Sequence, residues 1–426
     1  MTFESLGLAP VLLRALDALG HHQPTPIQAA AIPQAIQGHD LRAAAQTGTG
    51  KTGGFALPLL HRLFTTTETG RRPARHPRAL IITPTRELAA QVHEHLRAYA
   101  QYLPLRSTTI FGGVGIGNQL KTLARGVDVL VATPGRLLDH LDRGSVNLAY
   151  VEILVLDEAD RMLDMGFLPA LKRIMASVPR TRQTLLFSAT FPPAIKVLAQ
   201  QFMRDPVDIQ IARPNAVATT VSHRIHPVDG PRKRELLLHL LAEDSRRQAL
   251  IFSRTKHGSD KLCKHLANAG FRAAAIHGNK SQNQRTRALA DFKNGKITIL
   301  VATDIAARGL DIKQLPVVIN HDLPQVAEDY VHRIGRTGRA GADGLAISLV
   351  SHEEASQLRD IVRLLKQEIS IEPVVGFEPS HPLRLTAAPS RPGKSGTRWQ
   401  RPATAEPTQY RRRRHPQPPA AKFKRK

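Results

Sequence analysis

The sequence ILVLDEAD, from Ile153 to Asp160, joins four apolar residues directly to three carboxylates. A continuous apolar run of this length is typical of a strand that is buried on both faces of a parallel sheet. Ligands of such sheets bind outside the carboxyl ends of the strands, so this strand would deliver Asp157 and Glu158 to a site there. Acids after a strand are also common as helix N-caps, and for this stretch alone that alternative stays open.

A glycine-rich loop lies upstream of the acids, with the sequence AQTGTGKT from Ala45 to Thr52. Backbone N–H groups of such a loop can wrap a phosphate chain, and its glycines allow close approach and unusual dihedral angles. A glycine-rich turn with a chance Lys-Thr pair is the alternative, since Ala45 stands where the general pattern has glycine. The loop residues that we predict to bind a nucleotide are Gly48, Thr49, Gly50, Lys51 and Thr52.

The two motifs together predict a nucleoside-triphosphate site. Lys51 would contact the β- and γ-phosphates, and Thr52 and Asp157 would hold Mg²⁺, with Asp157 doing so through water. Glu158 would orient or deprotonate the attacking water. We therefore predict that Lys51, Asp157 and Glu158 are catalytic, and the N-cap alternative becomes less favoured.

Apolar, β-rich runs alternate with helix-like stretches along most of the chain, including a predicted helix at 86–99. This alternation predicts an α/β fold with parallel sheets covered by helices. The pattern restarts after Asp205-Pro206, so we expect a first domain at 1–208, a linker at 209–220 and a second domain at 221–376. The predicted strands are 80–83, 128–131, 153–156, 184–187, 250–252, 273–276, 297–301, 317–319 and 345–350.

The chain is strongly basic, with 60 Lys and Arg against 35 Asp and Glu, giving a formal charge of +25. Such an excess favours a polyanionic partner, most simply nucleic acid. Residues 377–426 are rich in Pro, Arg, Ser, Thr and Gln without apolar periodicity, so we predict a disordered basic tail. The tail could hold RNA through its charge and through Trp399 and Tyr410, or it could be a solvated extension.

Other sequence features exclude several classes of site. Cys263 is the only cysteine, so neither an internal disulfide nor a cysteine-based zinc cluster can form. The N-terminus has no basic segment followed by an apolar core, and no apolar run approaches bilayer length. We therefore expect a cytoplasmic protein without a membrane partner.

The succession of motifs over residues 1–372 resembles the DEAD-box ATP-dependent RNA helicases, and Thr2 to Leu8 resembles the bacterial RhlE-like branch. The resemblance implies two tandem RecA-like domains. The segment PTPIQ, which ends at Gln28, is similar to the family's adenine-reading motif. This similarity implies that Gln28 reads adenine and that Phe3 stacks on the base. This chain has His21 where the family usually has an aromatic residue.

Further motifs resemble those that bind the RNA backbone in the family. Small residues and arginine beside exposed backbone amides suit phosphate contacts without base reading. The resemblance implies RNA contacts at Pro84, Thr85, Arg86, Gly112, Gly113, Thr133, Pro134, Gly135 and Arg136 in the first domain, and at Gln282, Arg285, Thr303 and Asp304 in the second.

The remaining resemblances concern catalysis. Ser188 and Thr190 lie in the motif SAT, which couples hydrolysis to strand separation in the family. The resemblance places Asp311 near the ribose, and makes Arg336 and Arg339 arginine fingers that stabilise charge on the γ-phosphate.

As a whole the resemblance implies an RNA-dependent ATPase that uses ATP and Mg²⁺ to unwind structured or duplex RNA locally, largely without regard to sequence. An ATP-gated RNA clamp or scaffold with little unwinding is the alternative, and a DNA translocase is a remote third. Partners could include ribosome-assembly or RNA-decay proteins.

Overall fold

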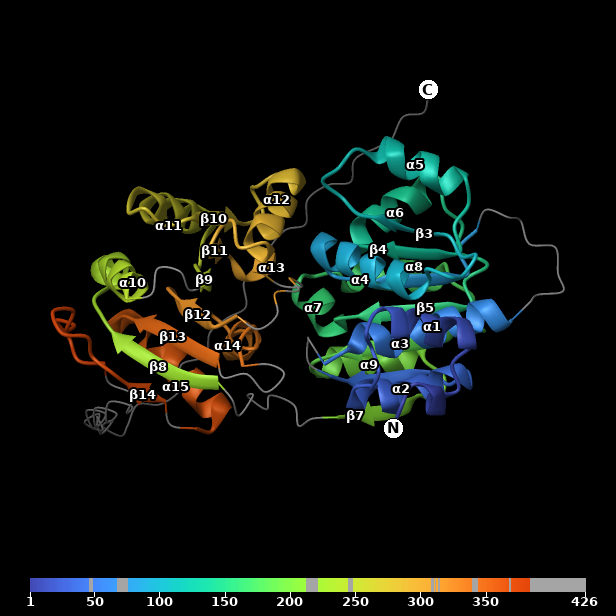
Figure 1. The fold of residues 1–426 in the computed structure, drawn as a ribbon, viewed down its shortest axis with the longest axis horizontal. Helices are drawn as coiled ribbons and strands as arrows, with labels where there is room; N and C mark the ends of the chain where they lie inside the picture. The colour runs from blue at the N-terminus through green and yellow to red at the C-terminus, as the bar shows by residue number, and fades with distance from the viewer. Residues whose placement is uncertain are drawn as a thin grey trace, which may run out of the picture. The chain divides into compact units, whose positions relative to one another are not determined.

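The computed structural model describes residues 1–45, 49–66, 76–211, 221–243, 248–307, 310, 312, 315–338, 344–367 and 369–383 (Figure 1). No helix among these residues is long and apolar enough to cross a membrane. The predicted tail falls outside them from residue 384 onward.

The first domain is built on a seven-stranded sheet in the order β3-β4-β2-β5-β6-β1-β7, and every pairing in it is parallel. Its strands are β1 (Leu41–Ala44), β2 (Ala79–Ile82), β3 (Ser107–Ile110), β4 (Val129–Ala132), β5 (Ile153–Asp157), β6 (Gln183–Ser188) and β7 (Val207–Gln210). Its helices are η1 (Glu4–Leu6), α1 (Pro10–Ala18), α2 (Pro26–Ile36), α3 (Lys51–Thr65), α4 (Arg86–Tyr99), α5 (Ile116–Ala124), α6 (Pro134–Asp142), α7 (Ala159–Asp164), α8 (Leu168–Ala176) and α9 (Pro193–Phe202).

The second domain has a seven-stranded sheet in the order β10-β11-β9-β12-β13-β8-β14, again parallel throughout. Numbered within each domain, both sheets follow the order 3-4-2-5-6-1-7. The strands are β8 (Val221–Pro227), β9 (Ala249–Phe252), β10 (Ala273–Ile276), β11 (Ile299–Ala302), β12 (Val317–Asn320), β13 (Gly344–Val350) and β14 (Ser370–Ile371). The helices are η2 (Gly230–Arg232), α10 (Lys233–Ala242), α11 (Lys256–Asn268), α12 (Gln282–Lys293), α13 (Asp304–Ala307), α14 (Ala327–Ile334), η3 (His352–Glu354) and α15 (Ala355–Leu365).

Each face of the first sheet is covered by its own apolar core. Along β2, Ala79 and Ile81 belong to one core, whereas Leu80 and Ile82 belong to the other. This alternation follows from the two-residue period of a strand, and burial on both faces explains why β2 is apolar throughout and β5 is apolar up to Leu156. The prediction of two tandem parallel-sheet α/β domains is confirmed.

Some elements differ from the sequence prediction. Helix α4 has the predicted bounds, whereas β1, β3, β7, β8 and β14 were not predicted. Strand β7 extends to Gln210, inside the expected linker. The start of the predicted tail is ordered against the second domain, because Arg232 lies over the Phe377 ring and the Ser380 amide donates to Asp229 at 3.1 Å.

A buried charge cluster joins four segments of the second domain. Lys233 of α10 pairs with Glu354 of η3, and both side chains are 5% exposed. Lys233 Nζ also donates to the carbonyl of His321 at 2.9 Å. Glu354 accepts from Arg254 at 2.7 Å and from the Leu323 amide at 3.1 Å. Glu354 is therefore the acceptor that compensates the buried ammonium of Lys233.

Replacing Glu354 with alanine should destabilise the second domain by about 3–5 kcal/mol, because the Lys233 charge would stay buried without its carboxylate. The measurement is the free energy of unfolding in urea. Glu353→Ala is the matched control, since this neighbouring carboxylate is exposed. Equal stability of the two variants would contradict the assigned role of Glu354.

Candidate nucleotide site

The described end of the phosphate loop leads into α3. Gly50 has φ 91° in the left-handed region and is the N-cap of that helix. A Cβ at Gly50 would lie 2.7 Å from Thr25 Oγ1, so both the backbone conformation and the close approach require glycine. Lys51 follows with 6% of its surface exposed. Gly48 lies outside the described residues.

Gln28 is hydrogen-bonded to the phosphate loop. Its Nε2 donates to the Gly50 carbonyl at 3.1 Å, and its Oε1 accepts from the Thr25 amide at 2.9 Å. A glutamine amide has two donor hydrogens and two acceptor lone pairs, so one of each is used here. The structure thus adds a loop-bracing role to the adenine-reading role that the sequence predicts for Gln28.

The two carboxylates after β5 are deeply buried. Asp157 and Glu158 are each 3% exposed, and Asp157 Oδ1 lies 4.0 Å from Lys51 Nζ. Neither of these two atoms has a hydrogen-bond partner among the described residues. Glu158 itself has φ 54° and ψ 53°, a left-handed conformation that is uncommon for residues other than glycine. Such strain costs about 1–3 kcal/mol and typically persists at functional sites.

The two carboxylates titrate differently. Burial raises the pKa of Asp157 to about 6, although Lys51 opposes the shift. Burial also acts to raise the pKa of Glu158, but Lys51, Arg161 and Arg336 outweigh it and the pKa is lowered. Glu158 is therefore ionised at neutral pH, as an acceptor of a proton or hydrogen bond from water must be.

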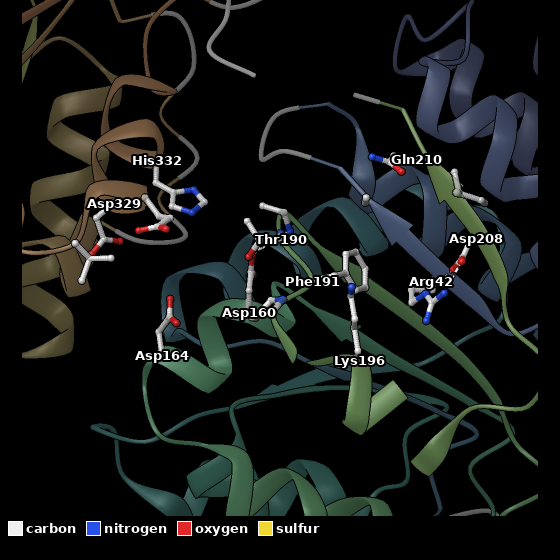
Figure 2. A pocket seen from close by; sticks show the side chains of 16 residues that line it. Arg42, Asp160, Asp164, Thr190, Phe191, Lys196, Asp208, Gln210, Asp329 and His332 are labelled. Carbon is white, nitrogen blue, oxygen red and sulfur yellow. Dashed lines mark hydrogen bonds and ion pairs between the residues drawn. The ribbon is translucent and has the colours of Figure 1, made fainter. Parts of the chain in front are cut away.

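Asp160 connects the acidic motif to the segment after β6. Its Oδ2 accepts from the Thr190 amide at 2.8 Å and from Thr190 Oγ1 at 2.9 Å. Its own amide donates to Ser188 Oγ at 3.2 Å. Figure 2 shows the Asp160 and Thr190 side chains close together in a cavity of about 940 Å³. The family resemblance implies a coupling role for Ser188 and Thr190, and the structure adds Asp160 as the residue that holds both of them.

Most of the predicted nucleotide residues that the structure describes line one cavity of about 320 Å³, whereas Thr49 is not part of its lining. The described part of its lining includes Phe3, Gln28, Gly50, Lys51, Thr52, Asp157 and Glu158. His21 also lines it, with its ring centroid 6.3 Å from that of Tyr99. Sequence reasoning missed Gln91, His95 and Tyr99, although their four-residue spacing on the predicted helix 86–99 would have placed them on one face.

Of the residues predicted as arginine fingers or as a ribose contact, the structure describes Arg336. Arg336 is 3% exposed and its Nη1 donates to the Leu310 carbonyl at 2.7 Å. Its charge is among those that lower the pKa of Glu158. Arg339 and Asp311 lie outside the described residues.

The predicted RNA residues of the first domain lie at loop ends after β2, β3 and β4. Thr85 caps α4 and accepts from the Leu88 amide at 3.3 Å, directly after the buried Pro84. Gly113 has φ 78°, and a Cβ there would lie 1.8 Å from Arg86. After β4, Thr133 is the N-cap of α6 and Pro134, Gly135 and Arg136 form its first turn. Arg136 donates to the Val114 carbonyl at 3.1 Å, which joins this turn to the segment after Gly112.

The predicted RNA residues of the second domain are engaged with protein groups. Gln282 Nε2 and Arg285 Nη2 each lie 2.8 Å from a carboxylate oxygen of Glu87, which follows Arg86. Asp304, after the buried Thr303, forms a double hydrogen bond with Arg333 at 2.6 and 2.7 Å. Both carboxylate oxygens of Asp304 are therefore occupied by Arg333, whose side chain they orient. A contact between Asp304 and RNA stays a prediction.

Comparisons with known proteins identify the family. The DEAD/DEAH box helicase model matches residues 25–198, and the helicase conserved C-terminal domain model matches residues 232–341. The chain is 44% identical over 373 residues to DEAD-box ATP-dependent RNA helicase 30 of Arabidopsis thaliana, covering 87% of this chain and 63% of that protein. It is 43% identical over 368 residues to the helicase CshA of Bacillus cereus, covering 86% and 69%.

Solved structures agree with these matches. Yeast Dbp5 bound to RNA and ADP BeF3 has a TM-score of 0.78 at 31% identity, covering 87% of this chain and 95% of that one. A DEAD box protein from the hyperthermophile Methanococcus jannaschii has a TM-score of 0.51 at 39% identity, covering 87% and 99%. The chain belongs to the DEAD-box family of ATP-dependent RNA helicases, with two RecA-like domains. The RhlE-like branch stays a prediction.

Gln28→Ala should weaken ATP binding about tenfold, because it removes the brace of the Gly50 carbonyl and the predicted adenine contact together. The measurement is the affinity of wild type and variant for ATP and for GTP. Loss of the hydrogen bond to Gly50 should lower the affinity for both nucleotides, whereas loss of adenine reading should lower the affinity for ATP alone. Gln23→Ala is the control, since Gln23 is exposed at the same cavity. Equal affinity of the wild type for ATP and GTP would contradict adenine reading.

Proposed function

We propose that this protein hydrolyses ATP to unwind or remodel RNA duplexes locally. The observation that carries this proposal is the single cavity in which Lys51, Asp157 and Glu158 meet Gln28, within a chain of the DEAD-box family. The chain spans 63–69% of the length of the plant and Bacillus cereus relatives.

The site fits Mg²⁺ as well as ATP. Asp157 Oδ1 is a buried carboxylate oxygen without a hydrogen-bond partner among the described residues, which is the type of ligand that Mg²⁺ prefers. Thr52 lines the same cavity and could add its hydroxyl. Bound there with ATP, Mg²⁺ would offset the charge that develops on the phosphates.

The protein groups would then divide the chemistry. Lys51 places a buried positive charge against the phosphates, and Glu158, kept ionised by its cationic neighbours, orients the attacking water or accepts its proton. Arg336 adds positive charge from the second domain, which suits stabilisation of the γ-phosphate in the transition state. RNA that favours the hydrolysis-competent arrangement of the domains would strengthen ATP binding by the same factor by which ATP strengthens RNA binding. The same shift toward that arrangement would stimulate turnover.

The link between the acidic motif and the segment after β6 favours an enzyme that couples hydrolysis to RNA remodelling over a passive clamp. Ser188 and Thr190 are fixed to Asp160, two residues after Glu158, so any shift of the acidic motif during hydrolysis is transmitted to this segment. We further propose that the protein acts in the cytoplasm, with RNA as its main partner and with ribosome-assembly or RNA-decay proteins as further partners. Phosphate and sugar contacts would make it largely independent of sequence.

Glu158→Gln should retain ATP binding within about threefold but lower the rate of hydrolysis by about 10²–10⁴, because the amide can no longer accept a proton. The measurement is RNA-stimulated phosphate release together with nucleotide affinity. Asp164→Asn is the control, since it makes the same carboxylate-to-amide change at an exposed position of α7. Hydrolysis at the wild-type rate in Glu158→Gln would overturn the role assigned to this residue.

Arg336→Ala should lower RNA-stimulated hydrolysis by about 10³ or more while ATP binding to the first domain persists. The variant also loses a hydrogen bond to the Leu310 carbonyl, so Arg336→Lys, which keeps the charge, separates a folding defect from a catalytic one. Arg363→Ala, at an 81% exposed arginine, is the control. If both Arg336 variants fold and hydrolyse ATP normally, the arginine-finger role is wrong.

A further inference from the structure

A second cavity of the first domain lies at the opposite edge of its sheet from the nucleotide site. Its volume is about 470 Å³, within the range of small-molecule sites. The lining includes Gly38 before β1, Glu152 before β5, Gln183 at the start of β6 and Arg204 before β7. These are the amino ends of the strands, whereas the nucleotide residues follow the carboxyl ends.

Positive charge dominates this cavity. Arg62, Arg182 and Arg204 line it, against the single carboxylate of Glu152. The Glu152 carboxylate is hydrogen-bonded to a fourth arginine, Arg78, which donates to its two oxygens at 2.7 and 3.0 Å. The cavity therefore presents an excess of positive charge to whatever enters it.

The three guanidiniums are held by neutral acceptors. Arg62 donates to the Gln183 side chain at 3.1 Å, Arg182 to the Pro179 carbonyl at 2.8 Å, and Arg204 to the Thr181 carbonyl at 2.9 Å. Within the described part of the chain, no carboxylate forms an ion pair within 4.0 Å with any of the three guanidiniums, although the Arg204 backbone amide donates to Asp40 Oδ2 at 2.7 Å. The three guanidiniums are thus fixed in position without a directly paired carboxylate, although Asp40 offsets part of the charge of Arg182 and Glu152 part of that of Arg62.

Arg182 is the most deeply buried of the three arginines. Its side chain is 4% exposed, and its buried Nε has no hydrogen-bond partner among the described residues. Burial lowers the pKa of Arg182 although the carboxylate of Asp40 opposes the shift, and the neighbouring Arg204 lowers the pKa further. Nη1 and Nη2 of Arg182 donate to the carbonyls of Pro179 and Phe202, so Nε is its one unsatisfied donor among the described residues. Leaving a buried donor unsatisfied is costly, and a bound ion or water is one explanation for such a group.

We propose that this cavity binds a small phosphate-bearing anion, of the size of pyrophosphate or the diphosphate of a nucleotide. The planar fork of a guanidinium matches two phosphate oxygens at once, and three such groups around one cavity suit a doubly or triply charged anion. Tyr150, 40% exposed in the lining, stacks on His76 at 5.1 Å between ring centroids. This flat aromatic surface gives a nucleotide base a place to stack beside the phosphates.

The test compares pyrophosphate binding by calorimetry in full-length proteins that all carry Lys51→Ala, so that the nucleotide site is weakened equally in each. Thr181→Glu adds a carboxylate at an exposed residue of the lining without removing any arginine. Gln101→Glu adds the same charge at an exposed position of the first domain outside the lining. Thermal unfolding of each variant confirms that it folds.

The expected result is at least about a tenfold loss of pyrophosphate affinity in Thr181→Glu, with no change in Gln101→Glu. Arg204→Gln should lose affinity similarly. ADP and a short single-stranded RNA are titrated in parallel. Equal pyrophosphate affinity in Thr181→Glu and Gln101→Glu would overturn the proposal, and so would a loss confined to the RNA, which would make the cavity part of an RNA path.

Discussion

The order of three neighbouring strands brings together the catalytic residues of the first domain. Strand β6 pairs in parallel with β5 on one side and with β1 on the other, so the segments after all three strands emerge side by side at one edge. Asp157 lies beside Phe187, and Ala44 lies beside Ser188. The phosphate loop, the acidic motif and the Ser188 segment are thus placed by sheet register. A slip of one residue would turn each side chain to the opposite face.

Burial of these residues then strengthens the electrostatic interactions between them. Lys51 and the two carboxylates share a site from which water is largely excluded, so their charges act strongly on one another. The left-handed Glu158 and the bracing of Gly50 by Gln28 fix the reacting groups before substrate arrives. Preorganised groups of this kind need little rearrangement during the reaction, which is where electrostatic catalysis gains most.

Sequence patterns predicted the elements whose residues are uniform in character. Strand β5 is apolar from Ile153 to Leu156, and α4 has clear helical periodicity. By contrast, Arg42 interrupts β1 and pairs with Asp208 of the edge strand β7, while β3 is Ser-Thr-Thr-Ile and only half-buried. The bracing role of Gln28 and the link from Asp160 to Thr190 depend on contacts between distant segments, which no local pattern records. The sequence therefore predicts the motifs that form the site but not the hydrogen bonds that connect them.

The measurement that bears most directly on the account is strand separation of a short RNA duplex under multiple turnover, with an excess of duplex over protein and with phosphate release followed in the same sample. If the carboxyl edge of the first sheet forms an ATP site that drives RNA remodelling, separated strands should accumulate beyond the amount of protein, in proportion to ATP consumed. ATP consumption stimulated by RNA without strand separation would contradict that account and identify an ATP-gated clamp.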